Sequence, residues 1–409
     1  MKAERKHLYL PIEIKARELD AKLLFSYYAV QEGYRVLLGE QRMVEEAAAV
    51  MAPGIFFSKG YSQRYRRRVI MNAAKANHKI VELDEEGFIF HDPEMYISER
   101  MNESLQPMIA QEYCWGDYQR EVIVNAYPDF KKRCYLTGNP RFDLLKEKYR
   151  PLYSKKTTAL RKQYGEFILI NTRFALYNHF RGRRKVEEHS ATAYIKKLYD
   201  AFLAMVKELS VRCPHVNIII RPHPSEDVTS YQKAFSSSKN VMVRNDGGSA
   251  EWIEASRLVI HNGCTTGIEA ALLGTPVVTY VPFIDARYDV EMPNNAGVKA
   301  YSVEEAAYYV NHKTKPKRTR FLSAYYEEEP SAHESILPLL RDLRVKSARY
   351  EPVVIPNVRN KNIRHRFSTL KVQVIRSFFK GLDEIEGKSA GIIIHPAGDN
   401  LFELTAKGK

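Results

Sequence analysis

The segment HLYLPIEIKARELDAKLLFSYYAVQEGYRVLL, residues 7–38, carries the pattern that indicates the fold. His7–Ile14 is largely apolar over the length of a strand, and a helical pattern, Arg17–Glu32, follows it and ends at Gly33. A second short apolar run, Tyr34–Leu38, comes directly afterwards. A strand, a helix and a second strand in that order are typical of a parallel α/β unit. We therefore expect the chain to open with a Rossmann-like half.

The alternation of short apolar runs with longer helical patterns continues and indicates an α/β protein with parallel sheets. Further expected strands of the first half are Gly54–Ser58, Lys79–Leu83, Glu112–Trp115 and Arg133–Thr137. Those of the second half are Phe167–Asn171, Val216–Arg221, Val241–Val243, Leu258–His261 and Pro276–Val281, with helices around Tyr194–Val211 and Thr266–Leu273. Two Rossmann-like halves that face a central cleft are the simplest architecture, with ligands at the carboxyl ends of the strands.

A change of character between Asn139 and Glu166 marks the expected connection between the halves. Pro140 and Pro151 interrupt the alternation there, and a basic helical stretch follows. With 409 residues, the chain is too long for a single ordinary core, which also favours two domains. The expected parts are residues 1–150, residues 151–350 and a tail, residues 351–409.

Composition limits the partners and the compartment. The 63 Lys and Arg exceed the 49 Asp and Glu, so the formal charge is +14. This charge suits nucleic acid, an anionic membrane face or a phosphorylated substrate. The four cysteines stand far apart without a C-x-x-C pair, which predicts reduced thiols. Neither a cleaved signal nor a run of about 18 apolar residues is visible, so we expect a cytoplasmic protein.

The tail has the pattern of a basic amphipathic helix. Its cations between 359 and 380 are Arg359, Lys361, Arg364, Arg366, Lys371, Arg376 and Lys380, without any Asp or Glu. Its apolar residues at helical spacing are Ile363, Phe367, Leu370, Val374, Phe378 and Leu382. Such a helix is typical of an element that binds an anionic membrane surface, which would make the protein peripheral on the inner membrane. A helix that packs on the N-terminal half explains the pattern equally well.

The segment Arg221–Glu226, RPHPSE, follows an apolar strand and is the most informative candidate for chemistry. Its two prolines restrict the loop and hold His223 at the carboxyl end of the strand. Arg221 and His223 can both donate hydrogen bonds to a phosphate. A lone His-Pro pair is more often an ordinary turn, but this longer motif predicts a substrate site that includes Ser225 and Glu226.

The segment His261–Ala270, HNGCTTGIEA, joins an apolar strand to a helix. Glycines and small hydroxyl residues at a helix N-terminus leave backbone N–H groups and the positive end of the helix dipole for an anion. A threonine there can instead simply cap the helix. Because this loop and RPHPSE both follow strands of one domain, we favour a phosphate site over two unrelated turns. The expected contacts are His261, Asn262, Gly263, Thr265, Thr266 and Glu269.

An acidic turn, Asp84–Gly87 (DEEG), follows the expected strand Lys79–Leu83 of the first half. One of its carboxylates can serve as a general base that deprotonates an acceptor hydroxyl. Glu85 and Glu86 are the candidates, although an isolated acidic loop is usually solvated surface. The pattern does not decide which of Asp84, Glu85 and Glu86 is the base.

Two further strand ends carry candidate substrate contacts. Arg17 and Glu18 lie at the first strand-to-helix turn, where Arg17 can bind a carboxylate or phosphate or simply begin the helix. Asn171 and Arg173 leave the first strand of the second half.

A run of arginines raises nucleic acid as a partner. Arg64, Arg66, Arg67 and Arg68 stand beside Tyr61 and Tyr65. No nucleic-acid-binding module is recognisable, so a surface that meets lipid headgroups or a glycan phosphate explains the run at least as well. The chain also lacks a P-loop, a G-x-G-x-x-G after a strand, a G-x-S-x-G elbow and a metal-spaced His/Cys set. We expect no nucleic-acid partner, no metal and no cofactor.

Six segments in order carry a resemblance to a known family: LPIEIKARELDAKLL, DEEG, TGNPRFD (Thr137–Asp143), NTRF, RPHPSE and HNGCTTGIEAALLG. Over about residues 8–340 the chain resembles the bacterial surface carbohydrate biosynthesis protein family. That family is similar to GT-B proteins related to capsular Kdo transferases, glycerophosphotransferases and UDP-GlcNAc 2-epimerases. The resemblance implies the GT-B fold, and a nucleotide sugar as donor without a bound metal.

The three loops also resemble those of bacterial sialyltransferases and similar CMP-ulosonic-acid transferases. The resemblance implies Glu85 or Glu86 as the base, His223 as the partner of the CMP phosphate, and Thr265 and Thr266 as phosphate donors. Retaining capsular Kdo enzymes are expected to have an aspartate where this chain has Asn171, so the resemblance favours an inverting mechanism.

The resemblance therefore implies a glycosyltransferase of capsule or lipopolysaccharide O-antigen synthesis. Its favoured donor is a CMP-activated Kdo or other ulosonic acid, bound by the second domain. Its acceptor is a lipid-linked glycan on the side of the first domain, and its tail meets the inner membrane. The alternatives are a sugar-nucleotide 2-epimerase, a CDP-glycerol-type phosphotransferase, a non-catalytic assembly partner and, from charge alone, a nucleic-acid binder.

Overall fold

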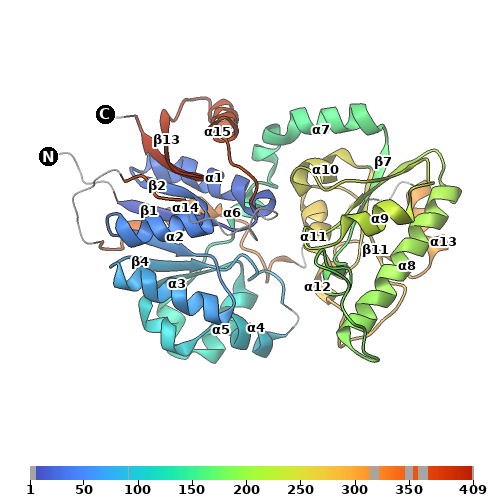
Figure 1. Ribbon diagram of the computed structural model, residues 1–409, viewed down its shortest axis with the longest axis horizontal. Helices are drawn as coiled ribbons and strands as arrows, with labels where there is room; N and C mark the ends of the chain where they lie inside the picture. Colours follow the sequence, from blue (N-terminus) through green and yellow to red (C-terminus); the bar gives the residue numbers. More distant parts are fainter. Residues whose placement is uncertain are drawn as a thin grey trace. The chain divides into compact units, whose positions relative to one another are not determined.

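The computed structural model describes residues 6–90, 92–312, 315, 322–345, 353–357 and 367–407. The chain divides into two compact units, Met1–Leu144 with Phe321–Lys409, and Leu145–Arg320 (Figure 1). Each unit is built on a β-sheet flanked by helices, so the predicted α/β class is confirmed. Among the described residues, no helix combines the length and apolarity needed to cross a bilayer.

The sheet of the first unit has the strand order β13-β14-β2-β1-β3-β4-β5-β6. Its parallel strands are β1 (His7–Ile12), β2 (Arg35–Glu40), β3 (Gly54–Ser58), β4 (Lys79–Leu83), β5 (Ile109–Cys114) and β6 (Cys134–Leu136). Helix α1 (Lys15–Gln31) connects β1 to β2, which confirms the strand–helix–strand opening. These strands match continuous apolar runs because parallel strands are covered on both faces.

Further helices complete the first unit. They are α2 (Gln41–Val50), α3 (Gln63–Lys75), α4 (Pro93–Arg100), α5 (Asp117–Ala126), α6 (Pro140–Asp143), α14 (Ala332–Arg341) and α15 (Val372–Glu386).

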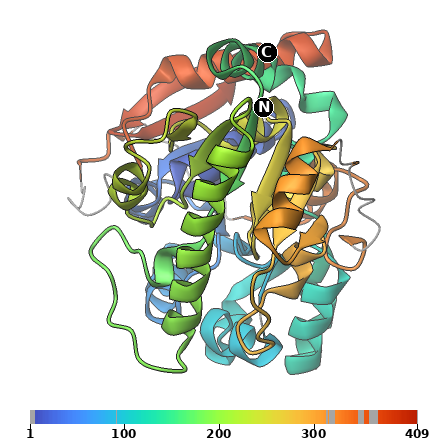
Figure 2. The same ribbon diagram turned by 90° about the vertical axis from the view of Figure 1, so that its right-hand side faces the viewer.

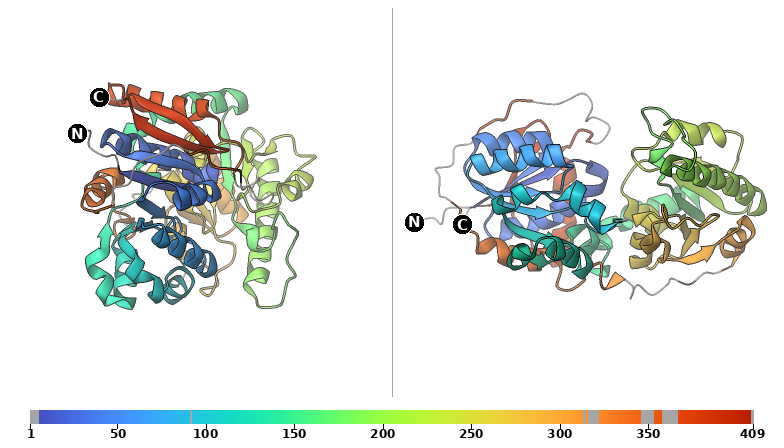
Figure 3. Two further views of the ribbon diagram at one scale, coloured as in Figure 1. Left: turned by 60° about the vertical axis from the view of Figure 1, so that its left-hand side comes forward. Right: turned by 90° about the horizontal axis from the view of Figure 1, so that it is seen from below.

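The described part of the predicted tail is built into the first unit. Strand β14 (Leu401–Ala406) pairs antiparallel with β2, and β13 (Ile392–Gly398) pairs with β14. Figure 3 shows this hairpin, in red, beside the blue N-terminal strands. The sequence analysis had expected a basic helical tail over residues 351–409 and no strands within it. The two strands pair here because they bury apolar side chains at the edge of the sheet.

The apolar face of α15 is also shifted from the predicted stripe. Ile375, Phe379 and Leu382 are the buried residues of this helix, whereas Val374 is exposed and Phe378 is half-buried. The helix begins only at Val372, so the helical spacing is not continuous with Phe367 and Leu370, which are buried ahead of it. The other members of the pattern, Ile363, Arg359, Lys361, Arg364 and Arg366, lie outside the described residues.

Two tyrosines of α1 hold α15 in place. The Tyr27 hydroxyl donates to Asp383 at 2.9 Å, and the Tyr28 hydroxyl donates to Glu386 at 2.6 Å. The rings of Tyr27 and Phe379 pack 5.9 Å apart. The helix therefore packs on the N-terminal half, as one of the two interpretations of the tail predicted.

The second unit holds a parallel sheet of order β12-β11-β10-β7-β8-β9. Its strands are β7 (Phe167–Asn171), β8 (Asn217–Arg221), β9 (Val241–Val243), β10 (Leu258–His261), β11 (Val277–Tyr280) and β12 (Val298–Ala300). Its helices are α7 (Pro151–Tyr164), α8 (Ala191–Arg212), α9 (Val228–Ala234), α10 (Ser249–Ala255), α11 (Thr265–Leu272), α12 (Glu291–Asn294) and α13 (Val303–Asn311).

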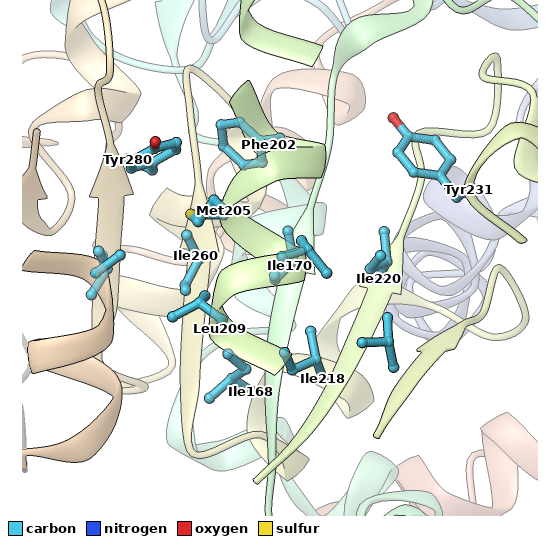
Figure 4. Packing of buried hydrophobic residues seen from close by; sticks show 14 of the residues in the cluster. Ile168, Ile170, Phe202, Met205, Leu209, Ile218, Ile220, Tyr231, Ile260 and Tyr280 are labelled. Atoms are coloured by element: carbon cyan, nitrogen blue, oxygen red, sulfur yellow. The ribbon is translucent and has the colours of Figure 1, made fainter. Parts of the chain in front are cut away.

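Helix α8 covers one face of this sheet. Ser190 caps it by accepting the N–H of Ala193, and its apolar residues recur at three- and four-residue intervals. Figure 4 shows Phe202, Met205 and Leu209 of α8 over isoleucines of β7, β8 and β10. This core supports the strands whose carboxyl ends carry the predicted phosphate loops.

Candidate functional site

The predicted phosphate loops meet at the carboxyl ends of β10, β7 and β8, which are neighbours in the sheet of the second unit. Hydrogen bonds join them: Thr172 donates to Glu226 at 2.8 Å, and Arg173 donates to the carbonyl of Asn262 at 2.9 Å. The carboxyl edge of a parallel sheet is where ligands of such folds bind. The structure thus brings RPHPSE, HNGCTTG and the NTRF segment together within one unit.

Glu226 is the internal support of the RPHPSE loop. Its buried carboxylate accepts hydrogen bonds from the Thr172 hydroxyl, the Tyr231 hydroxyl at 2.5 Å and the backbone N–H of His223 at 3.1 Å. Burial raises the pKa of Glu226, and these hydrogen bonds partly offset the effect. In this conformation the carboxylate fixes the loop, although the sequence analysis had placed it among the substrate contacts.

His223 is held so that one ring nitrogen can donate. Its Nδ1 accepts the N–H of Ser225 at 3.1 Å, and its carbonyl accepts the N–H of Glu226 at 2.8 Å. With Nδ1 as an acceptor, the neutral ring carries its proton on Nε2. Pro222 and Pro224 flank the half-buried ring and restrict the backbone. The Nε2–H of His223 therefore lies at the end of β8.

Arg221 lies at the end of β8 without a carboxylate partner in the described part of the chain. Its guanidinium donates to the carbonyls of Asp246 at 2.5 Å and Gly247 at 3.1 Å, and it lies 5.0 Å from the ring centre of Trp252. Burial lowers the pKa of Arg221 to about 10. The charge is therefore desolvated and only partly compensated, a condition that a bound anion relieves.

Arg173 is in a similar condition next to the HNGCTTG loop. It donates to the carbonyl of Asn262, and no described carboxylate forms an ion pair with it. Burial lowers the pKa of Arg173 below its ordinary value. The guanidinium packs so closely on Gly263 that a Cβ there would lie 2.4 Å from its Nε, and Gly263 has a φ of +58°. Only glycine suits this position.

Helix α11 begins without a side-chain cap, so its first N–H groups are not capped by a threonine. Its N-cap residue is Cys264, and the Thr266 hydroxyl bonds the Cys264 sulfur at 3.0 Å. Gly263 donates its N–H to Asn294 at 2.6 Å. Thr265 and Thr266 are half-buried at this helix start, where the dipole favours an anion.

His261 and Glu269 lie inside this arrangement. His261 is 0% exposed, its Nε2 lies 3.2 Å from the Thr279 hydroxyl, and its ring fills the space that a side chain at Gly267 would need. Burial lowers the pKa of His261 to about 3, so the ring is neutral. The buried carboxylate of Glu269 accepts a hydrogen bond from Ser249 at 2.6 Å. Both residues support the loop, although the sequence analysis expected them to contact substrate.

Asn171 ends β7 close to these loops. Its side chain is buried, and its Nδ2 has no hydrogen-bond acceptor among the described residues. A buried amide donor without an acceptor is unfavourable by about 1–3 kcal/mol. Asn171 therefore stays a candidate for a ligand contact.

The acidic turn of the first unit presents one of its three carboxylates. Asp84 is buried and bonded by Arg100, with Nε to Oδ2 at 3.0 Å. Glu85 is buried and pairs with Lys22 at 2.9 Å. Glu86, by contrast, has 54% of its side chain exposed. Of the two candidate bases, Glu86 is the one that a substrate can reach in this conformation.

A charged network surrounds Glu86 at the carboxyl ends of β1, β3 and β4. Arg17 bonds Glu86 at 2.5 Å and Glu18 at 3.2 Å, and Lys59 bonds Glu13 at 2.9 Å and Glu18 at 3.4 Å. Burial alone would raise the pKa of Glu18, but Lys59 and Arg17 outweigh it and lower the pKa to about 2. The same carboxylates raise the pKa of Lys59 against its own burial. Glu18 is thus a fixed anion that positions Arg17.

Several residues of these sites were not singled out from the sequence, among them four that carry charge or bond a loop directly. Lys59 directly follows β3, so the strand-end argument used elsewhere would have found it. Lys22, Arg100 and Asn294 lie within helices, where nothing in the local sequence marks them.

The predicted arginine-rich surface is reduced in the structure. Arg66 is buried and paired with Glu82, and Tyr61 is buried as well. Arg64, Arg67 and Arg68 remain exposed on α3. Among the described residues, no group of three or more His, Cys, Asp or Glu side chains is arranged to hold a metal ion.

The chain is similar in fold to several proteins of known structure. No protein-family model matches the chain, and no curated protein matches it. The UDP-GlcNAc 2-epimerase of Methanocaldococcus jannaschii is similar in structure, with a TM-score of 0.52 and 12% identity over 82% of this chain and 99% of that one. The UDP-GlcNAc 2-epimerase of Neisseria meningitidis has a TM-score of 0.51 and 14% identity over 83% of this chain and 100% of that one.

A polymerase shares the same fold. The wall teichoic acid polymerase TagF has a TM-score of 0.50 and 11% identity over 82% of this chain and 88% of that one. Likeness at such low identity shows the fold alone. The predicted GT-B type, with two α/β units, is confirmed.

Proposed function

We propose that this protein is an inverting glycosyltransferase of surface polysaccharide synthesis. It transfers a sugar from a nucleotide-activated donor to a lipid-linked glycan, and Kdo or another ulosonic acid carried by CMP is the favoured donor. In this proposal the second unit binds the donor and the first unit supplies the base for the acceptor.

The strongest support is the set of hydrogen-bond donors at the carboxyl edge of the second unit. Arg173, Arg221, the Nε2–H of His223 and the start of α11 all lie on loops that leave this edge. Neither arginine has a carboxylate partner among the described residues. The phosphate of a nucleotide sugar would supply the anionic partner that these hydrogen-bond donors lack. The negative charge of this phosphate grows as the glycosidic bond breaks. Fixed hydrogen-bond donors therefore stabilise the transition state more than they stabilise the bound nucleotide sugar.

Glu86 is the proposed base. Its exposed carboxylate takes the proton of the acceptor hydroxyl while that oxygen attacks the anomeric carbon of the donor. The nucleotide leaves with the electrons of the broken bond, and attack from the opposite side inverts the anomeric centre. Arg17 orients Glu86 through the 2.5 Å contact, and Glu18 and Lys59 position Arg17.

The membrane-facing part of the proposal rests on the tail. The exposed cations Lys371, Arg376 and Lys380 are the described members of its basic pattern. A contact between them and the anionic inner membrane would bring the enzyme to its lipid-linked acceptor.

Nucleotide-dependent stabilisation of the purified protein tests donor binding. The panel is CMP, CDP, UDP, UMP and GDP, and a ligand at about a hundred times its Kd adds roughly 2.7 kcal/mol. We expect CMP to stabilise the protein and His223→Ala to abolish the effect. His215→Ala is the matched control, because His215 is exposed in the same unit but precedes β8. No response to any nucleotide would favour a non-catalytic assembly partner.

A second variant tests the base. Glu86→Gln should lower kcat for glycosyl transfer by about 10²–10⁴, the usual contribution of a general base. CMP should still stabilise this variant, because Glu86 does not take part in donor binding. Full transfer activity in Glu86→Gln would reject this residue as the base.

A sugar-nucleotide 2-epimerase is the second candidate. It is favoured by the structural neighbours described as UDP-GlcNAc 2-epimerases. Stabilisation by UDP, with interconversion of UDP-sugar epimers and no transfer, would identify this activity. A response to CDP without CMP would instead indicate glycerophosphate transfer.

A further inference from the structure

Two loops of the second unit expose apolar side chains next to cations. The first is residues 180–189, which precede α8 and are exposed throughout. It carries Phe180 and Val186 together with Arg181, Arg183, Arg184 and Lys185. Figure 2 shows the segment between β7 and α8 running out alongside that helix. The second loop, residues 282–290, exposes Phe283 at 43% and Ile284 at 76%.

The two loops are joined by direct contacts. The Tyr288 hydroxyl donates to the carbonyl of His189 at 2.8 Å, and the Tyr288 ring packs 5.5 Å from that of Tyr194 at the start of α8. Tyr194 in turn donates to Asp289. The apolar tip Phe283–Ile284 and the basic loop therefore belong to one surface of the second unit.

The cations of the first loop outnumber its two carboxylates, Glu187 and Glu188. None of Arg181, Arg183, Arg184 and Lys185 forms an ion pair with a described residue. Arg181 lies over the ring of Phe180, and Arg183 lies 5.6 Å from the ring centre of Tyr177. An exposed cation beside an exposed apolar residue is the combination that an anionic bilayer interface satisfies.

Helices α7 and α15 combine cations with less exposed apolar surface. Helix α7 exposes Lys155, Lys156 and Lys162, but its aromatic residues, Tyr153 and Tyr164, are buried. Helix α15 exposes cations beside Val374, but its main apolar face packs on the first unit. A soluble polyanion would explain the four cations of the first loop, but not an isoleucine with three quarters of its surface in water.

We propose that the loops 180–189 and 282–290 dock the protein on an anionic lipid bilayer. The four cations meet lipid phosphates, and Phe283 and Ile284 enter the interfacial region. This inference goes beyond the proposed function, because it assigns a membrane contact to the second unit and is independent of the sugar that is transferred.

Co-sedimentation of the full chain with vesicles tests the proposal. The vesicles are phosphatidylcholine with and without phosphatidylglycerol, and the wild type should bind only the anionic ones. The triple variant Arg181→Gln/Arg184→Gln/Lys185→Gln should reduce partitioning by about a hundredfold, since each cation near the surface contributes roughly fivefold. Phe283→Ser/Ile284→Ser should reduce it by about tenfold or more.

A matched triple on α7 of the same unit is the control. Lys155→Gln/Lys156→Gln/Lys162→Gln removes the same charge from exposed positions and should leave partitioning within about twofold of the wild type. Urea unfolding of every variant confirms folding, and nucleotide stabilisation of the same variants separates failure of this proposal from failure of the proposed function.

Three results would overturn docking by these loops. One is a wild type that does not bind anionic vesicles. Another is loss of binding in Lys371→Gln/Arg376→Gln/Lys380→Gln but not in the loop triple, which would assign the contact to α15. The third is unchanged vesicle binding by Phe283→Ser/Ile284→Ser, which would indicate a purely electrostatic surface suited to a soluble polyanion.

Discussion

At the carboxyl edge of the first unit's sheet, each cation of the candidate site is matched by carboxylates. Lys22 pairs with Glu85, and Lys59 pairs with Glu13 and Glu18. At the same edge of the second unit's sheet, Arg173 and Arg221 donate to backbone carbonyls, and no described carboxylate pairs with them.

This difference in pairing determines what each edge is suited to bind. A network whose charges are already paired gains little from another ion, so the first edge suits a neutral hydroxyl with Glu86 as its proton acceptor. Half-buried arginines whose pKa is lowered by desolvation are stabilised when an anion binds. The second edge is therefore the candidate site for a phosphate. Removing a cation should accordingly destabilise the first unit and weaken ligand binding in the second.

The largest expected effect is on the stability of the first unit. Lys59→Met leaves Glu18 buried without its main partner and should lower the free energy of unfolding by about 3–5 kcal/mol. Urea unfolding measures the change, with Lys79→Met, an exposed lysine of the same unit, as control. A loss below about 1 kcal/mol in Lys59→Met would mean that the network is not a buried ion-pair network.

A pH effect of similar origin should follow from Glu18. Its pKa is lowered from 4.5 to about 2 in the folded chain, so folding stabilises the charged form. This contribution, about 3 kcal/mol, is present above pH 4.5 and is lost as the pH falls towards 2. The stability gap between the wild type and Glu18→Gln should therefore shrink between pH 5 and pH 3. Glu99→Gln, at an exposed position, should show no such trend. A constant gap would contradict the lowered pKa.

A smaller effect, on binding, should follow in the second unit. Arg173→Met removes a charge-assisted contact and should weaken nucleotide binding by about 1.5–3 kcal/mol, roughly 10–150-fold. Stability should change little, because an apolar side chain replaces a desolvated cation without a carboxylate. Titration calorimetry checks affinity, and Arg257→Met is the control, since Arg257 pairs with Glu166 at the amino ends of the strands. Equal losses of affinity in both variants would indicate that nucleotide binding depends on the overall positive charge and not on Arg173 itself.

The smallest effect should be on stability at Glu86. Its ion pair with Arg17 involves a carboxylate that is more than half exposed, so Glu86→Gln should change the free energy of unfolding by at most about 1 kcal/mol. Urea unfolding of this variant beside Lys59→Met makes the contrast direct. A loss as large as that of Lys59→Met would place Glu86 in the structural network and count against its role as a base.

Much of the fold was predictable because buried parallel strands are continuous apolar runs. β1, β3, β4 and β7 were expected close to their observed bounds. The C-terminal hairpin was missed, although Gly398-Asp399-Asn400 separates two apolar runs, as turn residues do between strands. The many cations that precede the hairpin favoured the prediction of a basic amphipathic helix instead. Partner strand β2 lies far back in the chain, so its pairing with β14 had no local signature.

The candidate sites show the same limit at the level of side chains. His223 and His261 both lie at the end of an apolar strand, in a loop that contains glycine or proline, so the sequence analysis placed both in the site, His223 at the leaving phosphate and His261 among the substrate contacts. His261 is enclosed because Gly267 lets α11 pack over its ring, whereas His223 stays half-buried beside two prolines. The accessible carboxylate of the acidic turn was likewise not predictable. Arg100 of α4 bonds Asp84 and Lys22 of α1 pairs with Glu85, which leaves Glu86 exposed.

Residue order alone was sufficient for the alternation of strands and helices, the positions of the loops and the kinds of group that they carry. These properties follow from periodicity and from the chemistry of near neighbours along the chain. Tertiary structure decided which side chains are enclosed, which cations keep a carboxylate and where the C-terminal residues pack. Those outcomes depend on contacts between segments that are distant in the chain, such as Arg17 with Glu86, because burial and pairing are set by three-dimensional neighbours.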